Sequence, residues 1–577
     1  MENQNNTNSE TNVGGNTTFR FVQVNEFQPN VDVGWSIIGN VTWKQDKNTI
    51  LVTNNQNYQV QISFLLPTAF RVRFRPVQNP DYSNNNSYAV VNRNLGKVKI
   101  TVKELSDNGG KLQIDTGELT VFVGLAPYGI AVYKAGQLVT EDTYERNLLY
   151  SNEAVANIMN APTNESYFGF GEKAGSQLDK KYFTMNFFNY DNFKYEDTGS
   201  ENNMVVPTTG GPLNPSGPLY NSIPMMVAVG KGTNNPGDSA VRYSYGIFLD
   251  NTSQSFFNLG SNDYSDMDGK FYFGALYNDL DYYVLVGTEN TGSKNIVADV
   301  INQYTQLTGR AAMPPMYALG YHQGCYGYFN TERLVAVANA YRNANIPIDG
   351  LHIDVDFQDN YRTFTISPEK FNSPVSVNTP DNMMVNGVMN GVLQLNGAAD
   401  MFQFLHNIGY KCSTNITGII SANPLDEKGN NTYYPTRDSV LNLNPNNAPE
   451  STYKPTAPVN PFIYNTRYQN GEDHEIFLAN EDYGTNEQSN PLFNPYISPT
   501  PSNPNNSESL GTYGFYCDLG NPEVKDWWGQ QYDYLLKTGL DMVWQDMTDP
   551  AIIPNFDNDT PDKTLPLNLM VFDKVTN

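Results

Sequence analysis

The period of the hydrophobic pattern changes once along the chain, near residue 296, and this change limits the possible folds more than any other feature. Before it, apolar and polar residues alternate in short runs such as 57–66, 70–77 and 97–105, which Asn, Asp, Gly and Pro separate. Alternation with a period of two at this spacing is typical of β-sandwich strands. We therefore predict an N-terminal β-sandwich domain over residues 19–299.

After residue 296, helices and strands alternate. Apolar residues recur at helical spacing until Gly309, and 313–323 then contains a sequence typical of a short buried strand. Three further helix-strand pairs are expected over 331–357, 398–417 and 524–547, with Thr331 as a possible cap of the first of these helices. Such repeats predict parallel strands with right-handed crossovers, in a doubly wound sheet or a (β/α)8 barrel.

The second domain is expected over 300–577, and only about four barrel strands are predicted in it. A closed barrel has eight. We therefore expect this α/β part to be the N-terminal half of a barrel, which a C-terminal segment or a second chain would complete. The polar stretch 422–510 is predicted to be an insertion after the third strand, because ordinary loops are much shorter. Residues 1–18 contain almost nothing to bury and are expected to form a flexible tail.

The charge of the chain disfavours two classes of partner. The formal net charge is -25 and no run of Lys or Arg forms a basic patch, which argues against nucleic acid and anionic membrane surfaces. A neutral ligand fits better. No apolar signal core opens the chain and no stretch approaches a membrane span, so we expect a soluble protein without a recognisable signal peptide.

Metal binding is not expected. The three cysteines are far apart and form no CxxC pair, which argues against structural zinc and a disulfide framework. The run that starts at Asp354 has carboxylates at calcium-loop spacing, but Asp359 and Thr365 stand where an EF-hand needs Gly and Glu.

Polar residues stand near the predicted ends of all four barrel strands. Carboxyl ends of barrel strands carry the catalytic groups of such folds, so topology alone predicts that these side chains converge. The residues are His322 and Gln323 on the first strand, Asp354 and Asp356 on the second, Asn415 on the third and Asp546 on the fourth.

Each of these residues also has a structural explanation. A single Asp at a strand end often caps a helix or turn, and His322 could be a hydrogen-bonded structural histidine as well as a substrate-binding one. Trp544 lies two residues before Asp546 and therefore on the same face of the strand. An indole beside a carboxylate suits a sugar subsite, although a core tryptophan is the alternative. Glycoside cleavage needs paired carboxylates, and the chain supplies a nucleophile candidate with several further acids.

Several ordered segments resemble glycoside hydrolase family 31, and within it the α-1,4-glucan lyases. YFGFGEK, FFNYDN, PLYNSIPMM and YGIFLDN resemble its N-terminal sandwich, and YTQLTGRAAMPPMYALGYHQ resembles the entry into its barrel. DVDFQDNYRTFTISPEKF is similar to the second-strand signature, and VWQDM to the nucleophile motif. The match runs from about residue 165 to 550, and the number of segments in order makes it specific.

The resemblance implies roles for individual residues. Asp546 matches the nucleophile, and Asp191 matches a sandwich-loop acid that reaches the neighbouring sugar. The proton donor would follow a later barrel strand, beyond Asn577. The residues that would line the sugar subsite next to the scissile bond are Asp354, Val355, Ile416, Trp544 and Met547.

The residues after the nucleophile bear on the reaction type. Hydrolases of the family usually continue as Asp-Met-Asn-Glu, whereas this chain has Asp546, Met547, Thr548 and Asp549, which resembles the lyases. The resemblance implies cleavage of terminal α-1,4-linked glucose from starch, glycogen or maltooligosaccharides to 1,5-anhydro-D-fructose, through a covalent glycosyl-enzyme and without a cofactor. A retaining α-glucosidase or transglucosylase is the alternative, and an inactive glucan-binding fragment is a third possibility.

Overall fold

The structure is a computed structural model that divides into two compact units, Phe21–Ala311 and Ala312–Asn577. Each unit has a core of its own. The residues that the structure describes are 24–188 (except 25, 108, 145, 153, 174 and 176), 221–232, 241–288 (except 262–266), 295–421 (except 360–362), 479–480, 493–495, 513–546 (except 517, 518, 520 and 521) and 569–570.

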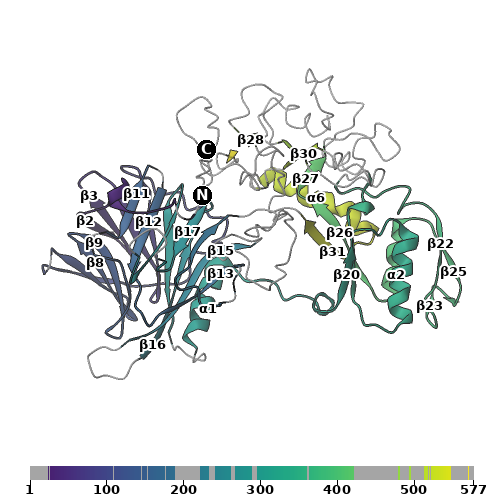
Figure 1. Cartoon of the computed structure of the whole chain (residues 1–577), viewed down its shortest axis with the longest axis horizontal. Helices are drawn as coiled ribbons and strands as arrows, with labels where there is room; N and C mark the ends of the chain where they lie inside the picture. Colours follow the sequence, from purple (N-terminus) through teal and green to yellow (C-terminus); the bar gives the residue numbers. More distant parts are fainter. Residues whose placement is uncertain are drawn as a thin grey trace, which may run out of the picture. The chain divides into compact units, whose positions relative to one another are not determined.

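The first unit is built from three antiparallel sheets (Figure 1). The largest has the order β13 (Ser166–Gly171), β15 (Ser222–Gly232), β16 (Val241–Leu249), β19 (Leu280–Val286), β5 (Ala69–Phe74), β4 (Gln59–Leu66), β3 (Thr49–Asn54) and β2 (Val41–Asp46). The second has the order β1 (Ser36–Ile37), β11 (Leu148–Ser151), β12 (Ala154–Asn160), β18 (Lys270–Ala275), β17 (Ser255–Asn258) and β14 (Thr184–Phe187). The third has the order β10 (Gln137–Glu141), β9 (Tyr128–Lys134), β8 (Leu119–Leu125), β7 (Lys111–Asp115) and β6 (Thr101–Leu105).

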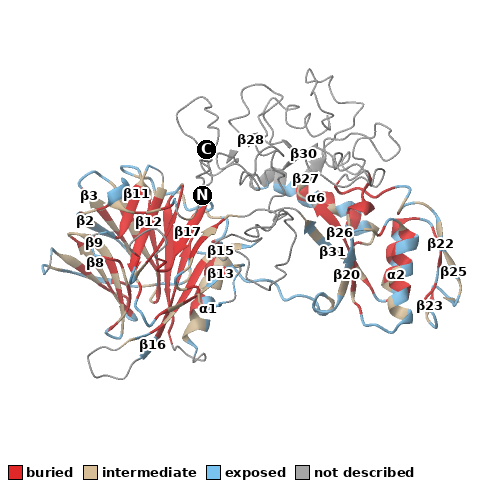
Figure 2. Ribbon diagram, viewed as in Figure 1, coloured by how far each residue is buried: buried red, intermediate tan, exposed pale blue. Residues whose placement is uncertain are grey.

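The alternating sequence accounts for this packing. In β4 the side chains of Val60, Ile62 and Phe64 are buried while those between them are partly exposed. One core cluster contains residues from all three sheets, so the sheets share their apolar faces. Figure 2 shows the buried residues concentrated in these strands. The predicted β-sandwich is confirmed.

Helix α1 (Ile296–Thr308) belongs to this first unit. Asn295 caps its start, and Gly309 follows its end with a φ of 87°, as its sequence predicts. Val300 and Leu307 are buried against residues of β15, β16 and β19. The boundary between the units therefore lies at 311/312 and not near 299, because the apolar face of α1 packs on the sandwich.

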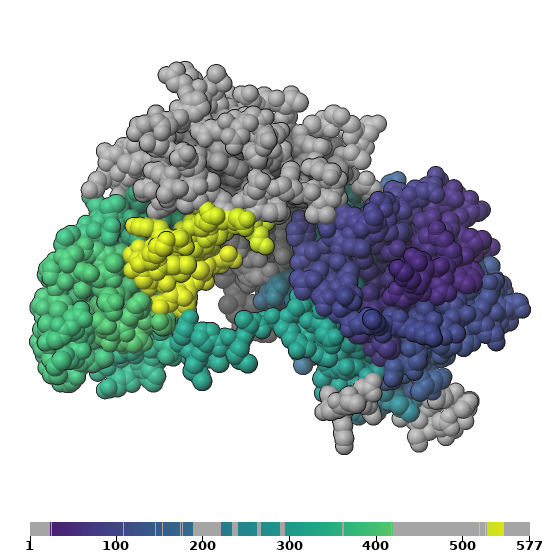
Figure 3. All heavy atoms as spheres, turned by 180° about the vertical axis from the view of Figure 1, so that it is seen from behind, coloured from purple at the N-terminus to yellow at the C-terminus, as the bar shows by residue number. Residues whose placement is uncertain are grey.

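The second unit contains four parallel strands in consecutive order: β20 (His322–Cys325), β21 (Gly350–Ile353), β26 (Lys411–Thr417) and β31 (Met542–Asp546). A doubly wound sheet reverses its strand order at a switch point. The uninterrupted order is instead that of one side of a (β/α)8 barrel. Helices α2 (Thr331–Asn343), α3 (Ala398–Asn407) and α6 (Pro522–Thr538) connect the strands, and Figure 3 shows α6 and β31 in yellow against the green residues that precede them.

Two details of this unit differ from the sequence prediction. The cap of α2 is Asn330, whose side chain accepts a hydrogen bond of 2.9 Å from the Arg333 N–H, while Thr331 is the first helical residue and is buried. The buried strand expected within 313–323 is not found there: β20 begins only at His322, and it is partly exposed because it lies at the edge of the described sheet. A 3-10 helix, Met316–Leu319, precedes it.

Short antiparallel strand pairs complete the description of the second unit. β22 (Val375–Asn378) pairs with β25 (Val392–Leu395), and β23 (Met384–Val385) pairs with β24 (Val388–Met389). β27 (Ile419–Ser421) and β29 (Phe493–Pro495) both pair with β30 (Tyr513–Tyr516), and β28 (Ala479–Asn480) pairs with β32 (Leu569–Met570).

The predicted tail, 1–18, lies outside the described residues, as does nearly all of the predicted insertion, 422–510. β27 pairs with β30, so residues on either side of the predicted insertion lie next to each other. Among the helices that the structure describes, none is long and apolar enough to cross a membrane.

Candidate active site

Asp354 and Asp546 come from two different strands of the barrel sheet, with β26 between them. Asp354 directly follows β21, and Asp546 is the last residue of β31. Residues of β26 and β31 pair in register, so Asn415 lies beside Trp544 and Thr417 beside Asp546. The convergence of strand-end carboxylates that topology predicts is therefore observed for these two residues.

One amide group connects the two carboxylates. The Asn415 Nδ2 atom donates to Asp546 Oδ2 at 2.6 Å and to Asp354 Oδ1 at 3.0 Å. Asn415 is completely buried, and its main-chain carbonyl accepts from Gln358 Nε2 at 3.0 Å. A neutral donor between two anions reduces the cost of holding them close together. Sequence reasoning noted Asn415 as a strand-end residue but did not predict this bridge.

Several groups around Asp354 shift its pKa, and the net shift is upward. Burial raises the pKa of Asp354, and hydrogen bonds from the Val355 N–H and from Asn415 oppose that rise. The nearby charge of Asp356 raises the pKa further. Carboxyl groups with pKa values shifted in this way are common in catalytic sites, because burial and like charges tune their acidity.

Asp356 is a second buried acid beside this group. It lies in the 3-10 helix Val355–Phe357 and is 1% exposed. Neither of its carboxylate oxygens has a hydrogen-bond partner in the described part of the chain. Burial raises its pKa, while the charge of Lys370 acts in the opposite direction. Ionised Asp356 raises the pKa of Asp354.

Trp544 lies on the carboxylate face, as predicted, and is partly exposed rather than buried in the core. Its indole meets the His352 ring edge to face, with the ring centroids 6.0 Å apart. His352 in turn bonds Ser413 through Nδ1 and faces His322 through Nε2, with 3.1 Å between His352 Nε2 and His322 Nδ1. Burial and the neighbouring His322 lower the pKa of His352. Sequence reasoning missed His352, although its place two residues before Asp354 was a usable signal.

The predicted position of His322 is wrong. His322 begins β20 and does not end it, because the segment before it forms a 3-10 helix instead of a strand. Its Nε2 atom lies 2.7 Å from the Tyr317 carbonyl oxygen, and its Nδ1 atom faces His352. Both ring nitrogens are thus engaged within the protein, which favours the structural role over substrate binding.

The remaining predicted subsite residues do not all lie at the candidate site. Val355 is buried directly after Asp354. Ile416 belongs to the core cluster that includes Leu351 and Cys412, and adjacent strand residues point to opposite faces. The structure therefore does not bring Ile416 to the Asn415 face. Met547 and Asp191 lie outside the described residues.

No group of three or more His, Cys, Asp or Glu side chains within the described ranges is arranged to hold a metal ion. Two carboxylates that share one amide donor, beside a half-exposed indole, can hold the hydroxyl groups and the anomeric carbon of a sugar ring.

Comparison with known proteins gives two matching family descriptions. Residues 311–571 match "Glycosyl hydrolases family 31 TIM-barrel domain", and residues 59–258 match "Glycosyl hydrolase 31 N-terminal galactose mutarotase-like domain". Together they cover both units. A curated relative, "Alpha-glucosidase 2" of Bacillus thermoamyloliquefaciens, is 29% identical over 315 residues, which is 54% of this chain and 34% of that protein.

Solved structures give the same fold. An α-1,4-glucan lyase of Gracilariopsis lemaneiformis, in a covalent intermediate complex with 5-fluoro-idosyl fluoride, matches with a TM-score of 0.65 and 22% identity, over 95% of this chain and 54% of that one. A family 31 dextranase of Flavobacterium johnsoniae, in complex with glucose, matches with a TM-score of 0.63 and 20% identity, over 93% and 50%. The chain thus spans from a third to a half of the length of these relatives. The two domain matches, in the expected order, show that the chain belongs to glycoside hydrolase family 31.

Proposed function

We propose that Asp546 is the nucleophile of a retaining α-glucan-cleaving active site. The observation that supports this most is the Asn415 amide, which holds Asp546 at 2.6 Å and Asp354 at 3.0 Å on one face of the sheet. A carboxylate that accepts such a hydrogen bond is held in a fixed orientation, which attack on an anomeric carbon requires.

Asp354 has a different role in this proposal. Its carboxylate accepts hydrogen bonds from hydroxyl groups of the bound glucose, while Trp544 packs against the apolar face of the ring and excludes water. A second carboxyl group has to protonate the departing oxygen. Asp354 is itself a candidate for that task, because burial raises its pKa.

Removal of Asp354 distinguishes these two roles. With Asp354→Ala, loss of a sugar-binding group should lower kcat/KM for maltotriose and for 4-nitrophenyl α-glucoside by similar factors. Loss of the proton donor should instead spare the nitrophenyl substrate, because nitrophenolate leaves without protonation. Sparing of that substrate would contradict the binding role of Asp354.

We propose elimination as the fate of the glycosyl-enzyme. The Asp546 carboxylate leaves C1 and takes the proton from C2, which produces an enol that tautomerises to 1,5-anhydro-D-fructose. The C2 proton is acidic beside a cationic anomeric centre, and a carboxylate in a dry site is a stronger base than one in water. The Thr548 and Asp549 residues that follow the nucleophile motif, and the similarity to a glucan lyase fold, support this reaction.

Hydrolysis or transglucosylation is the second candidate, which the α-glucosidase relatives favour. Digestion of maltotriose by the native protein in heavy water separates the two outcomes. Elimination predicts anhydrofructose that carries deuterium at C1, because solvent protonates that carbon when the enol tautomerises. Free glucose as the main product from the non-reducing end would refute elimination and leave Asp546 as the nucleophile of a hydrolase.

A further inference from the structure

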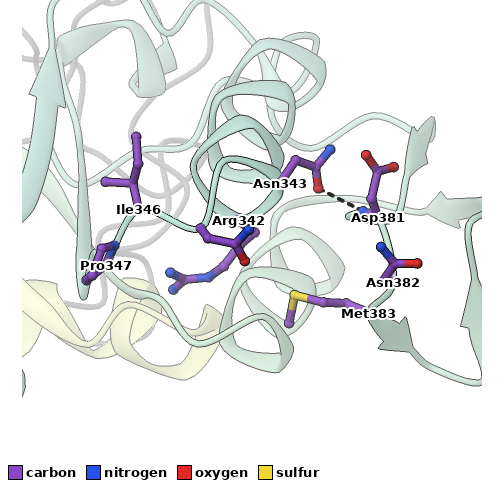
Figure 4. Close-up of a pocket in the computed structure, with 8 residues that line it drawn as sticks. Arg342, Asn343, Ile346, Pro347, Asp381, Asn382 and Met383 are labelled. Carbon is purple, nitrogen blue, oxygen red and sulfur yellow. Dashed lines mark hydrogen bonds between the residues drawn. The ribbon is translucent and has the colours of Figure 1, made fainter.

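A half-open pocket of about 510 Å³ lies in the second unit, away from the strand ends that carry the carboxylates. The end of α2, the loop that leads into β21 and the turn before β23 form its walls (Figure 4). This loop enters β21 at its amino end, whereas Asp354 follows the carboxyl end of the same strand. The pocket is therefore separate from the candidate active site. Its volume lies within the range of roughly 300–1,000 Å³ that small-molecule sites occupy.

Among the described residues, Arg342 is the cation that lines the pocket, and its side chain is engaged within the protein. Arg342 donates from Nε to the Ile408 carbonyl at 2.6 Å, and from Nη2 to the Ile348 and Gly409 carbonyls at 2.9 and 3.0 Å. Its guanidinium carbon also lies 4.1 Å from the centre of the Tyr410 ring. These contacts use three of the five guanidinium N–H donors, so the protein itself holds Arg342 in place.

The other polar groups of the pocket are available. Asp381 uses its main-chain N–H to bond the Asn343 Oδ1 atom at 2.7 Å, as Figure 4 shows, so the Asn343 Nδ2 atom stays free of that bond. No hydrogen bond in the described part of the chain involves the side chains of Asn345, Asp381 or Asn382. Asn345 and Asn382 have φ angles of 55° and 60°, which place both amides on tight turns.

This set of groups determines the kind of ligand. Amides offer both donors and acceptors, the Asp381 carboxylate accepts only, and the carbon atoms of Ile346, Pro347 and Met383 provide apolar surface. The carboxylate disfavours anions, and the guanidinium of Arg342 disfavours metal cations. A neutral molecule with several hydroxyl groups and apolar C–H faces satisfies all of these conditions.

We infer that this pocket is a second saccharide-binding site, which holds glucose units of the same α-glucan whose end is cleaved at Asp546. The chemistry of the pocket specifies a neutral saccharide, and the choice of glucan rests on the proposed function. The pocket lies at the opposite end of β21 from Asp354. A long polymer can reach both places, whereas a short oligosaccharide bound at the carboxylates does not reach the pocket. Long glucans therefore bind at two places, which increases their apparent affinity.

A double variant, Asn345→Gly with Asn382→Gly, removes two amides and keeps the positive φ angles that glycine tolerates. Asn57→Gly is the matched control, because Asn57 is an exposed residue of the first unit with a φ of 66°. The probe is soluble starch in affinity electrophoresis of the native protein, with an iminosugar present to occupy the candidate active site. Asp381→Ala serves as a second variant, since it alters no backbone conformation.

We expect the double variant to bind starch at least about tenfold more weakly than wild type, with an unchanged melting temperature. The Asp381→Ala variant should show a smaller loss, and turnover of maltotriose should stay unchanged in both. Starch binding equal to that of Asn57→Gly, or no starch binding by wild type, would overturn the inference. Failure of the proposed function gives a different result. The wild-type protein would then not turn over maltotriose, or would form no covalent sugar ester on Asp546, whatever its retention on starch.

Discussion

Replacement of Asn415 by alanine tests the bridge between the carboxylates. The change removes the 2.6 Å bond to Asp546 and the 3.0 Å bond to Asp354, and it leaves the two anions without a shared donor. A hydrogen bond to a charged group contributes about 1.5–3 kcal/mol. If one such bond is lost in the transition state, kcat/KM should fall about 10- to 100-fold, since each 1.36 kcal/mol is a factor of ten.

The pH profile of the Asn415→Ala variant provides an independent reading. The Asn415 hydrogen bond lowers the pKa of Asp354, so its removal should raise that pKa and move the acidic limb of kcat/KM to higher pH. Asn415→Asp should move the limb further, because it adds a third negative charge. Because the two acids interact, the apparent pKa of the acidic limb belongs to the pair and not to one residue.

The matched control is Thr414→Val. Thr414 precedes Asn415 on the same strand, points to the opposite face and is 1% exposed, and its hydroxyl has no partner in the described part of the chain. The control should keep wild-type activity and pH dependence. Activity of Asn415→Ala within twofold of wild type, with an unshifted acidic limb, would refute the bridging role.

Three predictions concern the stability of the first unit. Burial raises the pKa of Asp142 to about 7, so the folded state favours the protonated acid. The free energy of unfolding should therefore fall by up to about 4 kcal/mol as pH rises from about 4 to about 7, and urea titrations of Asp142→Asn should lose that dependence. Leu307→Ala should cost about 2–5 kcal/mol in the same assay, because Leu307 is fully buried against the sandwich, whereas Ile301→Ala at an exposed site should cost less than about 0.5 kcal/mol. Tyr243→Phe should cost about 1–3 kcal/mol, because the hydroxyl donates to the buried Glu165 carboxylate at 2.7 Å; an unchanged midpoint would contradict that contribution.

Periodicity predicted the type of the longer elements, such as β4 and α1. The alternation in 57–66 produced β4, with Val60, Ile62 and Phe64 buried, and the helical spacing before Gly309 produced α1. Periodicity does not say against which sheet a helix packs. The assignment of α1 to the sandwich depends on contacts of Val300 and Leu307 with strands far away in sequence, which no local pattern encodes.

The sequence was sufficient to predict which strand ends carry the carboxylates of the candidate site. Asp354 and Asp546 follow from the rule that the carboxyl ends of parallel barrel strands meet. The Asn415 bridge could not be predicted, because it depends on the register of β26 with β31 and on a side-chain rotamer. His322 was misplaced for a related reason: Met316–Leu319 is apolar enough for a strand, yet it forms a 3-10 helix, which moves His322 to the start of β20.

The central claim, that Asp546 is the nucleophile of a retaining site, is tested most directly by trapping. Incubation of the native protein with 5-fluoro-α-glucosyl fluoride should give a long-lived glycosyl-enzyme, since the fluorine destabilises the cationic transition state for its breakdown. Peptide mass mapping should place one sugar, as an ester, on Asp546, and Asp546→Asn should abolish the label. A sugar ester on Asp354 or on any other residue would contradict the account, as would inactivation without a covalent label.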